Sequence, residues 1–273
     1  MLYYINGDYI NKDEASIPFI DRGFLYGDGL FETLRFDNKI LFSPNNHLAR
    51  LQKGLEVIDL KLPHSKKYIM NLLNKVINKN NLNSGIIRLM ITRGNADTLL
   101  SEDCSPSVYI SIKPFYEIPN GPVKVIYFQE EKYPIIRFTP AIKSMNYLGN
   151  MLSKRDCEKL GGYEPVFYNN SNIITECAIR NIFYIKGDTI ITPSLDLGIL
   201  SGVMRDKILT IAKKLNFKIS ESHINFNDIH LMDEAFISST GIGLLSCYWD
   251  GWTSKYLKTK LIKKELFKSI NIT

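Results

Sequence analysis

Lys143 is the residue whose position in this sequence most suggests chemistry. It ends the run Thr139-Pro-Ala-Ile-Lys143, and Ser144-Met-Asn-Tyr-Leu148 follows, where a strand-like pattern passes into a helical one. A lysine at such a junction is positioned, and a positioned ε-amine can act as a general base. Most lysines are solvated surface residues, so spacing alone leaves the alternative of a surface lysine that begins a helix.

Two further charged residues stand inside an apolar, strand-rich stretch. Glu176 and Arg180 lie within Thr175-Glu-Cys-Ala-Ile-Arg-Asn-Ile-Phe183, where an unpaired charge would be costly to bury. We therefore expect partners for both side chains, and the alternative is a turn in which both face water. Arg50, on the polar side of a predicted helix, has no sequence-local feature that distinguishes it.

Two glycine-containing turns could bind an anion. Leu200-Ser-Gly-Val-Met-Arg-Asp206 runs from a flexible turn into a helix, and the amides at a helix N-terminus, together with the helix dipole, favour phosphate. Ser238-Ser-Thr-Gly-Ile-Gly243 follows an apolar strand and offers hydroxyls and exposed amides. Many such turns hold no ligand, so neither turn is specific by itself.

The elements that must position these residues change type along the first half of the chain. Short apolar or alternating runs predict a hairpin over 2–10, with a turn at 6–8, and a second hairpin over 31–41 around Asp37-Asn38. Helical periodicity predicts a helix over 44–58, with Ser43 as its N-cap, and another over 65–78. Residues 86–92 and 108–112 are predicted strands.

A proline-rich stretch divides the chain. Pro-Phe-Tyr-Glu-Ile-Pro-Asn-Gly-Pro, at 114–122, cannot continue a helix or a strand. We predict an N-terminal α/β domain at 1–115, a linker at 116–122 and a larger C-terminal domain at 123–273. The second domain should contain a strand at 123–128, helices at about 146–160 and 204–215, and short strands separated by turns at 169–170 and 187–188. The predicted fold class is α+β.

Composition narrows the possible functions. The 273 residues are 45% hydrophobic and 23% charged, which is typical of a folded globular protein. The formal charge of +6 comes without a polybasic run, which argues against nucleic-acid binding and favours small anionic ligands. Because Cys104, Cys157, Cys177 and Cys247 lack paired spacing, we expect no metal site, no disulfide framework and a reducing compartment.

The N-terminal residues and the lengths of the apolar segments indicate the expected cellular location of the protein. The N-terminal residues have no basic region followed by an apolar core, which is the pattern of a secretory signal. No stretch reaches the roughly 18 apolar residues that a membrane span needs. We therefore expect a cytoplasmic protein that has no membrane partner.

Five motifs together carry a family resemblance over nearly the whole chain. Their order and spacing resemble those of the class IV aminotransferase family, whose members are two-domain, fold-type IV pyridoxal-phosphate enzymes. The resemblance implies an enzyme with this cofactor, and it displaces the surface interpretations above. The motifs are Asp21-Arg-Gly-Phe-Leu-Tyr-Gly-Asp-Gly-Leu-Phe-Glu-Thr-Leu-Arg35, His47-Leu-Ala-Arg-Leu51, Lys143-Ser-Met-Asn-Tyr-Leu148, Thr175-Glu176 with Asn181-Ile-Phe183, and Gly202-Val-Met-Arg205.

The resemblance assigns roles to the residues at the matching positions. Lys143 is implied to be the catalytic lysine that forms a Schiff base with pyridoxal phosphate, and Arg50 to bind the cofactor phosphate. Glu176 is implied to pair with the pyridine nitrogen and keep it protonated. The remaining phosphate contacts would come from the amides of Val203 and Met204 and, on the other side, from Thr240 and Gly241.

The resemblance also implies a homodimer whose active site lies at the subunit interface. The apolar segments Phe24-Leu-Tyr26 and Leu30-Phe31 are the predicted interface. The expected partners are therefore a second copy of the chain and a small-molecule amino substrate.

The branch of the family depends on residues that contact the substrate. D-amino acid aminotransferases carry an Arg and a His after Thr-Arg-Gly, and residues 93–100 here contain no such pair beyond that motif. Branched-chain aminotransferases usually carry Tyr-x-Arg and a threonine in the phosphate turn; Ile86-Ile-Arg88 keeps only the arginine, and Met204 replaces the threonine. Glu176-Cys177 and Gly202-Val-Met-Arg205 are instead similar to motifs of some 4-amino-4-deoxychorismate lyases.

We therefore favour the lyase, which releases pyruvate and 4-aminobenzoate for folate synthesis. The alternative is a branched-chain or D-amino acid type aminotransferase that passes an amino group to a 2-oxo acid. A loop arginine that such lyases use for a substrate carboxylate is missing, so another arginine must replace it. A binding protein with lost chemistry is disfavoured by the retained lysine, carboxylate and phosphate arginine. The candidate substrate residues are Phe31, Thr33, Arg35, Arg88 and Arg180.

Overall fold

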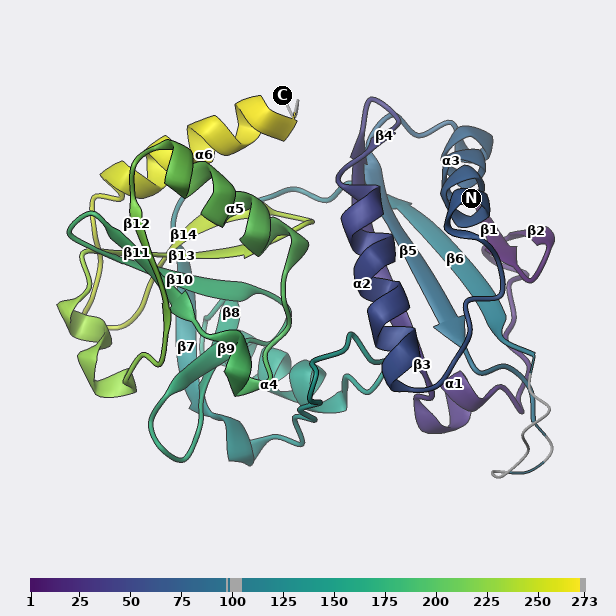
Figure 1. Ribbon diagram of the computed structural model, residues 1–273, viewed down its shortest axis with the longest axis horizontal. Coiled ribbons are helices and arrows are strands. Elements are labelled where there is room, and N and C mark those ends of the chain that lie inside the picture. Colours follow the sequence, from purple (N-terminus) through teal and green to yellow (C-terminus); the bar gives the residue numbers. More distant parts are fainter. Residues whose placement is uncertain (97, 99–104, 271–273) are drawn as a thin grey trace. The chain divides into compact units, whose positions relative to one another are not determined.

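The chain forms two compact units, which are described separately. The computed structural model describes residues 1–96, 98 and 105–270 (Figure 1). The first unit consists of Met1–Glu117 together with Ile142–Asn146, and the second consists of Ile118–Ala141 together with the described residues from Tyr147 onward. The passage at Glu117 falls inside the predicted linker, whereas 142–146 lies within the stretch predicted as the second domain.

The first unit is built on a six-stranded sheet whose neighbouring strands are all antiparallel. Both predicted hairpins and both predicted apolar strands are present. The turn of the second hairpin is Asn38-Lys39, one residue later than predicted, because Asp37 still pairs with Ile40 and the two turn residues take positive φ. In the sheet order β2-β1-β6-β5-β3-β4, the strands are β1 (Leu2–Ile5), β2 (Asp8–Asn11), β3 (Gly29–Asp37), β4 (Ile40–Leu41), β5 (Gly85–Thr92) and β6 (Ser107–Pro114).

Two long helices cover one face of this sheet (Figure 1). Helix α1 (Arg22–Tyr26) is short, and α2 (Pro44–Val57) and α3 (Lys66–Asn80) pack their apolar faces on the strands. Ser65 caps α3 by accepting from the amide of Tyr68 at 3.2 Å. Ser43 is the N-cap residue of α2 as predicted, but its backbone is left-handed and its side chain caps no amide, because capping requires an extended residue.

The core of the first unit also bears on the predicted dimer interface. Leu30 belongs to the buried cluster beneath α2, with 1% of its surface exposed, and Phe31 is buried as well. These two residues cannot supply an exposed interface, which corrects that part of the prediction. Phe24, Leu25 and Tyr26 remain exposed.

The second unit is built on an eight-stranded mixed sheet. Three neighbouring pairs are parallel: β11 with β12, β14 with β7, and β7 with β8. The short strands and the turns predicted at 169–170 and 187–188 are confirmed. The strands are β7 (Val123–Gln129), β8 (Glu164–Tyr168), β9 (Ile174–Cys177), β10 (Asn181–Lys186), β11 (Thr189–Pro193), β12 (Lys218–Ser222), β13 (Glu234–Ser239) and β14 (Gly243–Tyr248), in the order β12-β11-β10-β13-β14-β7-β8-β9.

Three α-helices and three short 3₁₀ helices complete the described part of this unit. Helices α5 (Val203–Lys214) and α6 (Leu257–Ile270) lie side by side against β13 (Figure 1). Helix α4 (Leu148–Lys159) begins two residues after the predicted start, because Ile142–Asn146 is held by the first unit. Helix α6 is not among the elements predicted from the sequence. The 3₁₀ helices are η1 (Glu130–Lys132), η2 (Leu195–Leu197) and η3 (Phe226–Leu231).

The α+β fold is confirmed, with a smaller first unit and a larger second unit rich in short strands. Within the part of the chain that the structure describes, no helix has the length and apolar character needed to cross a membrane. The same residues contain no group of His, Cys, Asp and Glu side chains suited to a metal ion. Cys157, Cys177 and Cys247 are buried and free, and Cys104 lies outside the described residues.

Candidate functional site

Lys143 lies on a short segment that pairs with the start of β3. The amide of Phe31 donates to the carbonyl of Lys143 at 3.1 Å, and the amide of Met145 donates to the carbonyl of Gly29 at 3.0 Å. Between these bonds, Leu30 and Ser144 form an antiparallel bridge. The backbone of the predicted catalytic lysine is therefore fixed against a buried strand.

The glycine-rich motif at 21–29 holds this segment in place. Asn146 donates from Nδ2 to the carbonyl of Gly27 at 3.2 Å. Gly27 has a φ of +69°, and a Cβ there would lie 2.4 Å from Oδ1 of Asn146, so a side chain does not fit. Asp21 fixes the other end of the motif by capping α1 through Gly23 at 2.8 Å and accepting from the Tyr109 hydroxyl at 2.7 Å.

Phe31 brings together two of the predicted cations. Nζ of Lys143 lies 4.4 Å from the centroid of the Phe31 ring, and Cζ of Arg88 lies 4.8 Å from the same centroid. Arg88 is exposed and pairs across β5 and β3 with Thr33. Because alternate strand residues share a face, Phe31, Thr33 and Arg88 lie on the sheet face opposite the helices.

Arg50 is bound to a buried carboxylate. Glu32, on β3, accepts from Nε and Nη2 of Arg50, both at 2.7 Å, and from Nδ1 of His47 at 2.7 Å. His47 and Arg50 are three residues apart on α2, so they project from the same side of the helix. Arg50 is 17% exposed, which corrects its predicted place on the polar side. Glu32 was not predicted as the partner of Arg50. The feature of the sequence that could have identified it is a glutamate within an otherwise largely apolar strand.

These groups fix one another's charge. Burial raises the pKa of the Glu32 carboxyl, but Arg50 and His47 outweigh burial and lower it to about 2. Burial lowers the pKa of His47, and the nearby charges of Arg50 and Lys143 act in the same direction. The neutral imidazole therefore donates from Nδ1 to the carboxylate. The charges of Arg50 and Lys143 both reach the imidazole of His47, so a negatively charged ligand is favoured beside these two cations.

In the second unit, Glu176 belongs to a network centred on Arg137. The guanidinium of Arg137 donates to Oε1 of Glu176 from Nη1, and to Glu130 from Nε at 2.8 Å and Nη2 at 2.6 Å. The hydroxyl of Thr175 donates to Glu130 at 2.7 Å. The second oxygen of Glu176 accepts from the amide of Leu200 at 3.3 Å. Glu176 thus has the partners that the sequence predicted, and it does not face water alone.

The turn before α5 is packed against Asn181. Nδ2 of Asn181 donates to the carbonyl of Leu200 at 3.0 Å, and a Cβ on Gly202 would lie 2.0 Å from Oδ1 of Asn181. Only glycine therefore allows the turn to pack there. Gly202 is the N-cap residue, and no side chain caps α5. The first amides of the helix, those of Val203 and Met204, are arranged as an anion site.

The glycine-rich turn that contains Thr240 and Gly241 follows β13 directly. Ser238 of β13 pairs with Asn181 at the start of antiparallel β10, so this turn and the turn before α5 lie at the same end of the sheet. Leu200 connects that end to Glu176. The structure thus gathers the predicted residues of the second unit at one sheet end.

Two of the predicted substrate arginines have carboxylate partners. Nε of Arg35 donates to Asp37 at 2.7 Å, and its guanidinium lies 4.1 Å from the centroid of the Phe115 ring. Arg180 is buried and donates to the buried carboxylate of Glu164. The alternative in which Arg180 faces water is therefore wrong. Arg88 is the exposed member of the three arginines.

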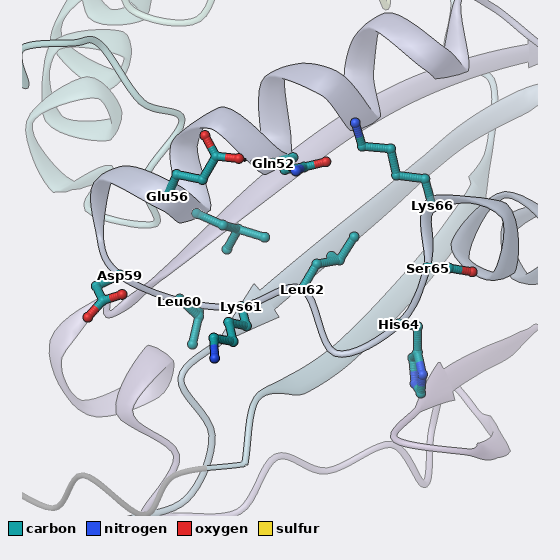
Figure 2. Close-up of a pocket in the computed structure, with 10 residues that line it drawn as sticks. Gln52, Glu56, Asp59, Leu60, Lys61, Leu62, His64, Ser65 and Lys66 are labelled. Atoms are coloured by element: carbon teal, nitrogen blue, oxygen red, sulfur yellow. Dashed lines mark hydrogen bonds between the residues drawn. The ribbon is translucent and has the colours of Figure 1, made fainter.

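Residues 97, 99 and 100, in the stretch that lacks a paired Arg and His, are outside the described residues. A surface pocket of the first unit (Figure 2) contains none of the predicted site residues, so charge networks rather than this pocket define the site. The pocket is lined by Gln52, Leu55, Glu56, Asp59, Leu60, Lys61, Leu62, His64, Ser65 and Lys66.

Comparison with known proteins points to one family with several activities. Residues 29–247 match the family described as amino-transferase class IV. The chain is 33% identical over 252 residues to a D-alanine aminotransferase of Listeria monocytogenes serotype 4b, covering 89% of this chain and 85% of that relative. It is 29% identical over 259 residues to an aminodeoxychorismate lyase of Bacillus subtilis, with the same coverage of 89% and 85%.

A solved structure supports the fold. The crystal structure of a branched-chain aminotransferase from Thermoproteus uzoniensis with norvaline superposes on this chain with a TM-score of 0.90. The superposition covers 99% of this chain and 94% of that chain, at 21% sequence identity. At this level of sequence identity, the structural similarity shows a shared fold but not a shared substrate.

Proposed function

Because the chain is an enzyme of the class IV aminotransferase family, we propose that it is a pyridoxal-phosphate lyase that converts 4-amino-4-deoxychorismate to 4-aminobenzoate and pyruvate. The supporting observation is the position of exposed Arg88, whose guanidinium shares the Phe31 ring with the amine of Lys143. This arrangement suits an amino substrate that carries a carboxylate away from the carbon bearing its amine.

The residues of both units fit the proposed cofactor. In the first unit, Arg50 is held in one orientation by Glu32 and can offer its fixed positive charge to a phosphate. In the second unit, the N-terminus of α5, which no side chain caps, has amides that suit a phosphate. The carboxyl of Glu176 suits a ring nitrogen, because an acceptor beside that nitrogen favours its protonated form.

We assign the remaining phosphate contacts to Val203, Met204, Thr240 and Gly241. All four stand at the sheet end that the predicted second-unit residues share. Backbone amides bind phosphate without a charged side chain, so the guanidinium of Arg50 would be the charged phosphate contact in this assignment.

The chain's own groups then divide the work of the lyase reaction. When bound, pyridoxal phosphate accepts the electrons left on the carbon that bears the substrate amine. Lys143 would hold the cofactor covalently until the substrate amine replaces it, and its free Nζ would then take the proton from that carbon. Arg88 would bind a substrate carboxylate, with Thr33 and Phe31 on the same face beside it. The C–O bond to the enolpyruvyl group would then break, the leaving enolate would take up a proton to become pyruvate, and the ring would become aromatic.

An aminotransferase is the second candidate, favoured by the 33% identity to a D-alanine aminotransferase. In that reaction Lys143 would return the proton to C4′ of the cofactor, and the amino group would pass to a 2-oxo acid. The two reactions use the same lysine, so their products distinguish them.

The test supplies the purified protein with aminodeoxychorismate and, separately, with a panel of amino acids and 2-oxo acids. We expect 4-aminobenzoate and pyruvate in the first incubation, at a rate above any amino-group transfer. Lys143→Ala should abolish both the reaction and borohydride-reducible attachment of the cofactor, whereas the exposed control Lys159→Ala should preserve both. If pyridoxamine phosphate forms from amino acids and no 4-aminobenzoate appears, the protein is an aminotransferase and the lyase proposal is wrong.

Arg88→Gln tests the substrate carboxylate. Loss of a charge-assisted hydrogen bond should raise KM for aminodeoxychorismate by about 10- to 100-fold, with a smaller effect on kcat. The exposed arginine Arg155 gives the matched control, Arg155→Gln, which should leave KM unchanged. An unchanged KM in Arg88→Gln would remove Arg88 from the substrate site.

A further inference from the structure

Arg137, in a loop of the second unit, links η1 and β9 through its side chain. Nε and Nη2 form a fork on the two oxygens of Glu130, at 2.8 and 2.6 Å, and Nη2 also lies 3.2 Å from the hydroxyl of Thr175. The other terminal nitrogen, Nη1, donates to Glu176. A bidentate pair of this kind fixes the plane of a guanidinium, so Glu130 determines the direction from which Arg137 reaches Glu176.

The carboxylate of Glu176 is fixed at both oxygens. Oε1 accepts from Arg137, and Oε2 accepts from the amide of Leu200 at 3.3 Å. An ionised carboxylate has about four acceptor positions, so these contacts orient the group while leaving it able to accept a further hydrogen bond.

The charge state of Glu176 depends on the same contact. Burial raises the pKa of Glu176 above its ordinary value, and Arg137 offsets only part of this effect. Without the guanidinium, burial would favour the protonated carboxyl. A protonated carboxyl cannot favour a protonated ring nitrogen beside it.

We propose that Arg137 is a positioning residue for Glu176, which it orients toward the ring nitrogen of the cofactor, with Glu130 as its anchor. This inference rests on the proposed function, which assigns Glu176 to that nitrogen. Arg137 would thus influence the electronic state of the cofactor through Glu176, without itself binding the cofactor or the substrate.

The experiment is a double-mutant cycle on the holoenzyme, with Arg137→Gln, Glu176→Gln and both together. Arg137→Gln should lower kcat by about 10- to 100-fold, while affinity for pyridoxal phosphate stays near that of the wild type. In the Glu176→Gln background the same substitution should have little effect on kcat. Equal fold-changes in both backgrounds would overturn the inference, because Arg137 would then act independently of Glu176.

Absorbance gives a readout that needs no turnover. The bound-cofactor spectrum of Arg137→Gln, recorded across pH, should resemble that of Glu176→Gln, whereas Arg155→Gln should keep the wild-type spectrum. Arg137→Lys, which retains charge but loses the fork, should lie between wild type and Arg137→Gln. A wild-type spectrum in folded Arg137→Gln would overturn the inference.

Glu130→Gln provides a second variant should Arg137→Gln not fold. It weakens the anchor and leaves the guanidinium in place, so it should shift the spectrum in the same direction by a smaller amount; an unchanged spectrum would count against the inference. Failure of the proposed function looks different, because the wild-type protein would then bind no pyridoxal phosphate at Lys143. A wild type that binds the cofactor at Lys143, with an additive cycle, would contradict the role of Arg137 alone.

Discussion

Glu32 is the residue on which the charge of the first unit's site depends. It is fully buried, both of its oxygens accept from Arg50, and Oε2 also accepts from His47. Because its carboxylate occupies Nε and Nη2 of Arg50, it sets the orientation of the guanidinium before any ligand arrives. Buried pairs of this kind leave an uncompensated charge when one partner is removed.

Glu32→Gln should therefore destabilise the protein in a pH-dependent way. The folded-state pKa of about 2 lies below the ordinary 4.5, so the ionised carboxylate contributes stability that is fully present above about pH 5 and lost as the pH falls toward 2. The difference in pKa corresponds to about 3 kcal/mol. Chemical denaturation of wild type and variant between pH 7 and pH 2 should show their difference shrink across that window.

The exposed Glu56, on α2 of the same unit, provides the control. Glu56→Gln removes an exposed charge but keeps an oxygen that can accept from Gln52, as Glu56 does at 3.1 Å, so its unfolding free energy should follow that of the wild type throughout. A Glu32→Gln difference that stays constant from pH 7 to pH 2 would contradict the ion-pair interpretation.

Arg50→Ala should weaken cofactor binding more than it slows the bound enzyme. The lost contact is a charge-assisted hydrogen bond to phosphate, which corresponds to about 10- to 100-fold in Kd for pyridoxal phosphate. Titration of the cofactor-free protein, followed by absorbance, measures that constant. Lys53→Ala, which removes an exposed cation from the same helix, should leave Kd unchanged, and an equal effect of both variants would point to general charge rather than a specific contact.

Sequence motifs assigned roles to residues of the candidate site but not to the side chains that bind them. Lys143, Arg50 and Glu176 were assigned through the family resemblance. Glu32 and Arg137 were not given roles, since each lies far along the chain from the residue it binds, with separations of 18 and 39 positions. Neither helical nor strand periodicity carries information over such distances.

The turn before α5 is the element whose geometry the site needs most. Gly202→Ala would bring a Cβ to 2.0 Å from Oδ1 of Asn181, so the turn or the asparagine must shift. We expect affinity for pyridoxal phosphate to fall at least about tenfold, because amides at a helix N-terminus bind only an anion that they can reach closely. Equilibrium titration with the cofactor checks this.

Gly121 supplies a matched glycine without such a neighbour. A Cβ there meets nothing within 4 Å, so Gly121→Ala should bind the cofactor like the wild type. Should Gly202→Ala do so as well, the close packing of this turn would have no role in phosphate binding.

Most helices and strands of the fold followed from local patterns, but helix α6 was not among the predicted elements. The helix predicted at 146–160 begins at Leu148 because Asn146 bonds to Gly27, 119 positions away. Ser43 has the residue type of an N-cap but a left-handed backbone that prevents capping. In both cases the conformation that the rest of the chain imposes on the backbone overrides the structural preference of the local sequence.

At the scale of the whole molecule, an apolar surface at residues 17–26 supports the expected homodimer. Ile17, Phe19, Ile20, Phe24 and Tyr26 are all exposed, and the Phe19 and Phe24 rings lie 6.0 Å apart. Clustered exposed apolar side chains usually mark an interaction surface. We expect a second copy of the chain to cover this surface, with the active site at the interface as the family resemblance implies.

Phe19→Asp combined with Phe24→Asp should shift the protein toward monomer, because each introduces a charge that association would have to bury. Analytical ultracentrifugation at micromolar concentration measures the shift. Ile40→Asp, at a residue of the same unit that is 72% exposed, should leave the dimer intact. A wild type that is monomeric and fully active at this concentration would contradict the expectation.

The assignment of Ile142–Asn146 to the first unit has a consequence for cutting the chain. Because the chain leaves that unit after Glu117 and returns only for these residues, a break between Glu117 and Ile118 would leave the second piece carrying the strip that pairs with Gly29 and Phe31. Two co-expressed fragments, 1–117 and 118–273, would then reassemble by strand donation, as in donor-strand complementation. The 118–273 fragment would then supply Lys143 to a sheet whose six strands all belong to the 1–117 fragment.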